Sequence, residues 1–116
     1  ISNGELIRDE ENWSGSIKHG NPYQYQIDDF GPTPAPCELL DGVLLASKAS
    51  TLIENDLRFD PQFAFDFYDM DFCRTARQKN LHLGTWPIDI YHESKGLFGG
   101  DRWVATYQKY MDKWGS

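Results

Sequence analysis

Residues 65–79 read Phe-Asp-Phe-Tyr-Asp-Met-Asp-Phe-Cys-Arg-Thr-Ala-Arg-Gln-Lys. From Met70 onward this stretch contains neither glycine nor proline, and it carries an apolar stripe made of Phe72, Cys73 and Ala76. Helix-breaking residues are therefore absent where the apolar spacing fits one face of a helix. The stretch predicts a central amphipathic helix, around which the rest of the chain can be arranged.

The two ends of this helix also have recognisable signals. Asp66, near the start of the stretch, is the expected N-cap, and the Asp69 carboxylate follows three residues later. Asn80 is a residue type that ends helices in the left-handed conformation. We therefore expect the helix to begin just after Asp66 and to end at Asn80.

Upstream of this helix, the pattern predicts short elements. Residues 37–40 and 43–47 are apolar runs on either side of Asp41-Gly42, which predicts one or two strands interrupted by a turn or bulge. Ser50 is expected to cap a short helix that runs through Asn55. The proline at position 61 then favours a loop.

Downstream, alternating residues predict two more short strands, 81–85 and 88–92, followed by a glycine-rich loop. A terminal helix is expected over 101–114, because its apolar residues recur every three to four positions. That helix has no complete sheet to cover in the predicted arrangement. We therefore expect part of its tryptophan and tyrosine stripe to be exposed, or buried against a second copy of the chain or a missing half.

The chain of 116 residues has room for one hydrophobic core, so residues 1–116 are expected to form a single domain or a domain fragment. Residues 1–36 are rich in glycine, serine, asparagine and proline and predict a loop-rich extended segment. Within them, three prolines at positions 32–36 predict a stiff connector or an edge strand. The predicted fold class is α/β, with short strands, a central helix and a C-terminal helix in residues 37–116.

The composition limits the classes of molecule that the chain is expected to bind. A net charge of -7 opposes binding to the phosphate backbone of nucleic acids. No apolar run approaches the roughly 20 residues that a membrane span needs. Cys37 and Cys73 are the only cysteines, and we expect both thiols to be free and partly buried in a cytoplasmic protein.

Three groups of residues are candidates for catalysis or ligand binding. The first is the acidic helix start with Asp69, whose carboxylates either stabilise the helix N-terminus or provide a proton acceptor beside a cleft. The second is residues 91–96, where His92 is either a metal ligand or a half-buried structural histidine and Lys95 is of a type that binds phosphate. The third is Asp41-Gly42, a simple bulge or a point of close ligand approach.

Taken in order, these groups resemble the acceptor-side half of a family 2 glycosyltransferase with the GT-A fold. The resemblance rests on Leu40–Ala46, Arg58-Phe59-Asp60, the run Phe67–Arg77, and Trp86–His92 followed by Gly96. In that family, a strand with an Asp-Gly pair precedes an acidic helix start, and a strand and a histidine follow it. Tyr68 stands here in place of an acid and Phe72 in place of a leucine, which is typical of a divergent branch.

The resemblance implies roles for individual residues. Asp69 matches the catalytic base, and His92 matches a position that joins the metal and diphosphate site, where Mn²⁺ or Mg²⁺ is the implied cofactor. Asp71 and Cys73 match the helix positions that follow the base. The implied substrate-binding residues are Asp41, Gly42, Tyr68, Trp86 and Lys95.

The implied reaction is transfer of a sugar from a nucleotide-diphosphate sugar to a hydroxyl of a glycan or another acceptor, with inversion. The nucleotide-binding half and its Asp-x-Asp metal motif are expected upstream of residue 1, because Asp69-Met70-Asp71 lies at a helix start rather than at a strand end. Phe67 and Trp13 are further candidates to stack on sugars, or else core residues. The alternative function is a non-catalytic module that binds carbohydrate or protein through the same aromatic residues.

Overall fold

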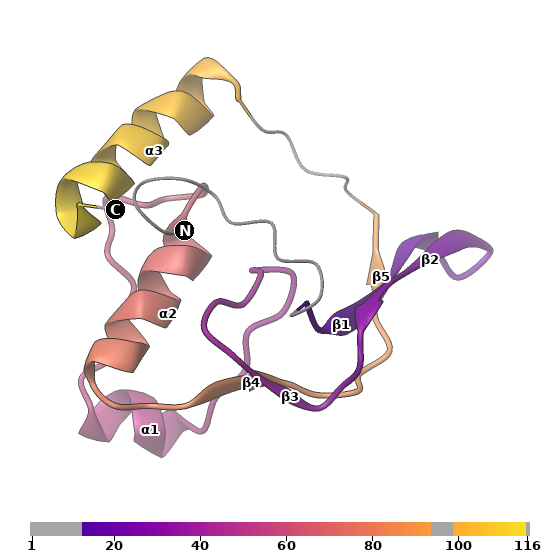
Figure 1. Cartoon of the computed structure of the whole chain (residues 1–116). Helices are drawn as coiled ribbons and strands as arrows, with labels where there is room; N and C mark the ends of the chain where they lie inside the picture. Colours follow the sequence, from indigo (N-terminus) through magenta and orange to yellow (C-terminus); the bar gives the residue numbers. More distant parts are fainter. Residues whose placement is uncertain (1–12, 94–98, 116) are drawn as a thin grey trace.

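Two small sheets and three helices form a mixed α/β fold (Figure 1). The computed structural model describes residues 13–93 and 99–115. In chain order the elements are β1 (Gly15–Asn21), β2 (Gln24–Gly31), β3 (Ala35–Cys37), α1 (Ala49–Glu54), α2 (Tyr68–Gln78), β4 (Leu83–Thr85), β5 (Tyr91–His92) and α3 (Asp101–Trp114). The predicted α/β class with short strands is confirmed at this level.

The first sheet has the strand order β2-β1-β5. Strands β1 and β2 form an antiparallel hairpin, and β5 adds to β1 in parallel. At the hairpin turn, Oδ1 of Asn21 accepts hydrogen bonds from the backbone N–H groups of Tyr23 and Gln24 at 2.9 and 3.1 Å. Residues 1–36 were expected to be loop-rich, so the hairpin within their described part corrects that expectation. The sequence signal was weak because the hairpin is largely exposed and lacks a clean apolar alternation.

The second sheet pairs β3 with β4 in antiparallel fashion. Strands predicted over 37–40 and 43–47 do not form; the strand lies at Ala35–Cys37 instead. Pro36 is tolerated there because both strands of a two-stranded sheet are edge strands, and a nitrogen that faces away from the partner strand makes no ladder bond. The prolines at positions 32–36 were expected in a stiff connector or an edge strand, and Pro36 does lie in an edge strand.

The helices lie close to their predicted positions. The first of them, α1, begins after Lys48 without a side-chain cap, so the predicted Ser50 cap is wrong although the helix is right. Helix α2 begins after Phe67, which is left-handed at φ 64°, and Asp66 is not its cap. Asp66 instead accepts a hydrogen bond from Nε of Arg102 at 2.9 Å. Asn80 adopts the predicted left-handed conformation, with φ 61°.

The core lies where α3 packs against the start of α2 and the loop before it. Phe63, Phe67 and Tyr110 are buried at its centre, and partly buried hydrophobic residues surround them: Tyr68, Met70, Trp103, Tyr107, Met111 and Trp114. Part of the apolar stripe of α3 therefore docks within the chain, and a second copy or a missing half that covers the rest stays a prediction. Among the tryptophans and tyrosines of α3, Tyr110 is fully buried, whereas Trp103, Tyr107 and Trp114 are only partly buried and so stay partly accessible.

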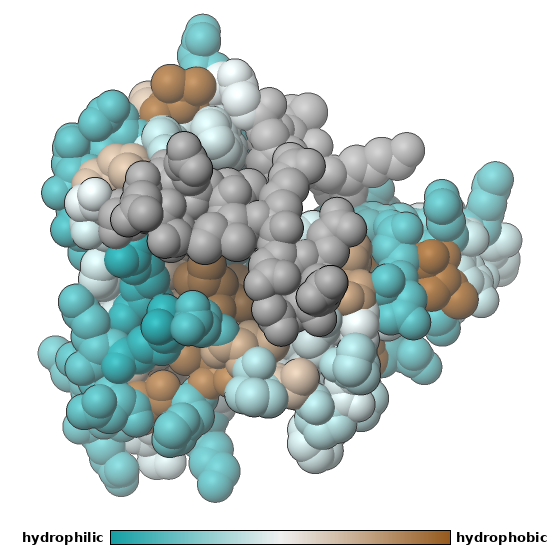
Figure 2. Space-filling view, in the orientation of Figure 1, coloured by the Kyte–Doolittle hydropathy of each residue, from teal (hydrophilic) through white to brown (hydrophobic). Residues whose placement is uncertain are grey.

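The surface carries its apolar side chains in separate patches, one of them over the β1–β2 hairpin (Figure 2). Within residues 13–93 and 99–115, no helix combines the length and the apolar character needed to cross a bilayer.

Candidate functional site

Four of the predicted site residues meet at the start of α2: Asp41, Gly42, Tyr68 and Asp69, called here the Asp69 site. The backbone N–H of Gly42 donates to Oδ2 of Asp69 at 2.8 Å. The hydroxyl of Tyr68 donates to the carbonyl oxygen of Gly42 at 3.1 Å. Two of the groups singled out in the sequence, the Asp-Gly pair and the acidic helix start, thus belong to one site.

Local backbone geometry places these residues. The left-handed Phe67 turns the chain into α2, so that Tyr68 and Asp69 are its first two residues. Gly42 allows the loop to approach closely, because a Cβ at this position would lie 2.0 Å from the Tyr68 hydroxyl oxygen. Leu40 strengthens the attachment by donating its N–H to the Cys73 sulfur at 3.2 Å. The backbone of loop 38–43 is thus bonded to helix side chains instead of to a strand.

Burial sets the protonation behaviour of the Asp69 site. It raises the pKa of the Asp69 carboxyl, and the negative charge of Asp41 adds to the rise. The N–H donors of Gly42 and Met70 oppose it by stabilising the charged form. Burial, followed by the charges of Asp69 and Asp41, also raises the pKa of the Tyr68 phenol. A raised pKa makes an ionised carboxylate a stronger proton acceptor than an ordinary exposed one. The group can act as a base as long as it is ionised near neutral pH.

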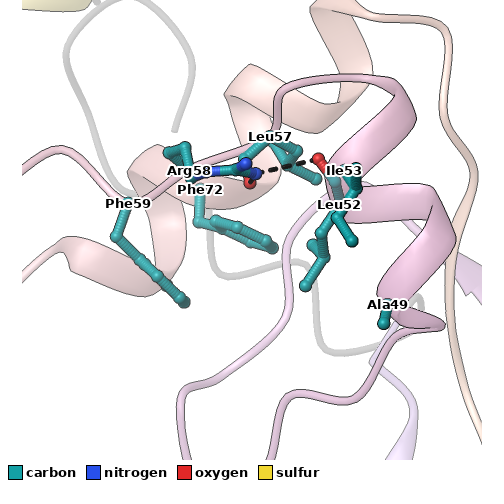
Figure 3. Close-up of a pocket in the computed structure, with 7 residues that line it drawn as sticks. All are labelled: Ala49, Leu52, Ile53, Leu57, Arg58, Phe59 and Phe72. Carbon is teal, nitrogen blue, oxygen red and sulfur yellow. Dashed lines mark hydrogen bonds between the residues drawn. The ribbon is translucent and has the colours of Figure 1, made fainter.

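An apolar pocket of about 310 Å³ lies close to this site (Figure 3). Phe59 connects the two, because its ring stacks on Phe72 with centroids 4.3 Å apart and lies 6.1 Å from the Tyr68 ring. The pocket is lined by Ala49, Leu52, Ile53, Leu57, Arg58, Phe59 and Phe72. In the sequence Phe59 is only part of the Arg58-Phe59-Asp60 motif, and its place beside Tyr68 comes from the fold.

His92 lies in a different environment. It ends β5 and stands opposite His19 of β1, with ring centroids 5.6 Å apart. In Figure 1, β5 and α2 lie well apart, and no interaction within the described ranges joins His92 to Asp69. The prediction that a strand ends at His92 is confirmed. That His92 and Asp69 belong to one site stays a prediction. His19 is the aromatic partner of His92, and only the fold places the two rings together.

Trp86 and Lys95 are the two other residues predicted to bind substrate. Trp86 is 70 % exposed in the segment between β4 and β5. Lys95 lies outside the described residues. No group of three or more His, Cys, Asp or Glu side chains able to hold a metal occurs in the part of the chain that the structure describes. The residues described thus do not assemble the oxygen-rich ligand set that Mg²⁺ or Mn²⁺ favours.

The side chain of Asp71 contacts side chains of α3. It is 1 % exposed, and its Oδ1 lies 2.7 Å from Nζ of Lys113 and accepts a hydrogen bond from Nε1 of Trp114 at 3.0 Å. Lys113 also reaches Oδ2 of Asp60 at 2.9 Å. Asp71 therefore ties α2 to α3. A sequence can suggest a carboxylate at a helix start, but the distant lysine that neutralises it is found only in the fold.

A comparison with protein-family models gave no match, and searches of curated proteins and of solved structures gave none either. Function is therefore inferred from the motifs and from the geometry of the Asp69 site.

Proposed function

We propose that the chain is the acceptor side of a sugar-transferring enzyme with a partial GT-A-like fold, in which Asp69 is the catalytic base. The single observation that supports this most is the hydrogen bond from Gly42 to Asp69. It brings together the two motifs whose order along the chain suggested a family 2 glycosyltransferase. The nucleotide-binding half of the proposed enzyme lies outside these 116 residues.

In this mechanism the acceptor hydroxyl donates its proton to Asp69. The hydroxyl oxygen forms a bond to the anomeric carbon of the donor sugar as the bond to the nucleotide diphosphate breaks, and the diphosphate leaves with that electron pair. One base is sufficient when the configuration at this carbon inverts. Mn²⁺ or Mg²⁺ would supply charge neutralisation of a leaving diphosphate, but no step here is assigned to it because its ligand set is not assembled by the residues described.

The chain's own residues have distinct tasks. The N–H groups of Gly42 and Met70 each bond one carboxylate oxygen, which fixes the plane of the Asp69 carboxylate. Each oxygen keeps a further lone pair for an acceptor hydroxyl. Tyr68 and Asp41 border the carboxylate and are proposed to bind acceptor hydroxyls, while Phe59 offers a ring face to an apolar part of the acceptor.

The test is turnover of the protein made from the full reading frame, with a panel of nucleotide sugars and hydroxyl acceptors. Asp69→Asn should lower kcat about 10²- to 10⁴-fold and leave the donor KM nearly unchanged, because the proton acceptor is lost while the shape stays. The matched control is Asp56→Asn, at an exposed left-handed position that asparagine tolerates. Near-normal turnover of Asp69→Asn would overturn the assignment of the base.

The isolated 116-residue chain provides a second check. It should show little sugar transfer and at most weak binding of nucleoside diphosphates with Mn²⁺, measured by titration calorimetry. Micromolar binding would show that the chain contains a nucleotide site, contrary to the proposal.

A second candidate function is a carbohydrate- or protein-binding module, and one observation favours it. Tyr25 and Tyr91 lie side by side on the first sheet with ring centroids 5.3 Å apart, and Nζ of Lys18 lies 5.4 and 5.2 Å from them. Both tyrosines are more than 40 % exposed. Such a surface suits a sugar ring or a partner protein. Loss of glycan-array binding in Tyr25→Ala, with Asp69→Asn unaffected, would favour this function over the enzyme.

A further inference from the structure

The first sheet brings two histidines and an aspartate together across its three strands. His19 of β1 is the parallel partner of His92 of β5, and the register between β1 and β2 places Asp28 opposite Ile17. Because side chains alternate along a strand, Ile17 and His19 share a face, and Asp28 and His92 lie on that same face. Lys18, Tyr25 and Tyr91 occupy the other face.

Asp28 determines which nitrogen of His19 is available. Its Oδ2 makes a close contact with Nδ1 of His19. A carboxylate can only accept when ionised, so Nδ1 carries the proton and, in the neutral ring, Nε2 keeps the lone pair. A carboxylate that orients a histidine in this way is the usual outer partner of a metal-binding imidazole.

His92 has an unsatisfied polar atom. Its Nδ1 is buried and has no hydrogen-bond partner among the residues described. A buried ring nitrogen without a partner costs free energy unless a ligand or a water satisfies it. The tilted rings of His19 and His92 have centroids 5.6 Å apart, a separation that two imidazoles can have when each binds one shared ion at about 2.1 Å.

We infer that His19 and His92 form a two-imidazole site for a transition-metal ion of the Zn²⁺, Ni²⁺ or Cu²⁺ type, with Asp28 as the positioning residue for His19. Imidazole nitrogen suits these ions, whereas Mg²⁺ and Ca²⁺ select oxygen ligands. The described residues supply no third ligand, so water or another small ligand completes the coordination. The bound ion would tie β5, only two residues long, to the β1–β2 hairpin.

This inference is independent of the proposed sugar transfer. It differs from the Mn²⁺ or Mg²⁺ role that the resemblance gives to His92, because the ligand set is nitrogen-rich and centred on the first sheet. Failure of the metal site would leave the Asp69 assignment intact, and failure of Asp69 as a base would leave the metal site intact.

The test uses the untagged chain, titrated with ZnCl₂, NiCl₂ or MgCl₂ by calorimetry and by thermal unfolding. Zn²⁺ and Ni²⁺ should raise the Tm because they bind only the folded arrangement, and Mg²⁺ should leave it unchanged. His19→Gln and His92→Gln should each weaken binding at least about tenfold, and Asp28→Asn about tenfold, as for other outer-sphere partners. His82→Gln is the matched control, since His82 is exposed and outside the pair.

Two further measurements keep the result clear. Far-ultraviolet circular dichroism without metal shows whether each variant is folded, and imidazole NMR signals of the unmutated chain show which rings the ion touches. Cys37→Ser should bind metal like the unmutated chain, which separates this site from thiolate binding. An absent Tm shift, a shift equal with Mg²⁺, undiminished binding in His19→Gln and His92→Gln, or NMR changes confined to His82 would overturn the inference.

Discussion

The backbone N–H of Gly42 donates to Oδ2 of Asp69 across 27 positions of sequence. This bond attaches loop 38–43 to the start of α2 and partly buries the carboxylate that the sequence marks as a candidate base. The same glycine accepts from the Tyr68 hydroxyl, so the loop is held through both its N–H and its C=O. Stability and the proposed chemistry thus depend on the same contacts.

Gly42→Ala should destabilise the protein by about 1 to 3 kcal/mol, because the new methyl group would overlap the Tyr68 ring and hydroxyl. Urea unfolding measures the free energy of unfolding. In a Tyr68→Ala background the same substitution should cost clearly less, so the double-mutant cycle should show coupling. Gly100→Ala is the control, since a Cβ there meets nothing within 4 Å. Equal costs in both backgrounds would contradict the close approach of Gly42 to Tyr68.

Lys113→Met should lower the free energy of unfolding by about 3 kcal/mol, because it leaves the buried Asp71 carboxylate without its neutralising charge. Chemical denaturation at neutral pH is the measurement. Lys109→Met on the exposed side of the same helix should stay within about 0.5 kcal/mol. Similar losses in the two variants would show that the Asp71 ion pair is not the cause.

Asp60 should contribute to the loss of folding stability in acid. Hydrogen bonds from Gln62 and then from Lys113 lower the pKa of its carboxyl to about 2. The folded pKa lies below the unfolded value of about 3.9, so the contribution is present above pH 4 and is lost as the pH falls toward 2. Asp60→Asn should therefore be less stable at neutral pH and lose less stability between pH 4 and pH 2. The exposed Asp56→Asn should retain the slope of the unmutated chain, and an unchanged slope in Asp60→Asn would refute this role.

The two thiols should react differently. Cys73 is fully buried, whereas Cys37 is half-buried, and burial raises the pKa of both thiols. In the folded protein, iodoacetamide should modify Cys37 slowly and leave Cys73 unmodified; in urea both should react. Mass spectrometry of tryptic peptides measures the two sites separately. Early modification of Cys73 would mean that loop 38–43 opens readily from α2.

The positions of the helices could be predicted from local sequence patterns. Each turn of an α-helix is closed by hydrogen bonds between residues four apart, so the apolar spacing in 65–79 and 101–114 was enough to predict α2 and α3 within a few residues. Asn80 could likewise be predicted as a left-handed end, because that preference belongs to the residue itself.

The contacts between distant segments could not be predicted in this way. The hairpin of β1 and β2, the pairing of His19 with His92, and the contact of Gly42 with Asp69 depend on chain segments far apart or on weakly patterned strands. Their register is set by burial and packing that no local propensity encodes. Asp66 illustrates the difference. Its local pattern predicted a helix cap, but it bonds instead to Arg102, 36 positions away. A hydrogen bond between two charged groups is stronger than one to the uncharged N–H of a helix end.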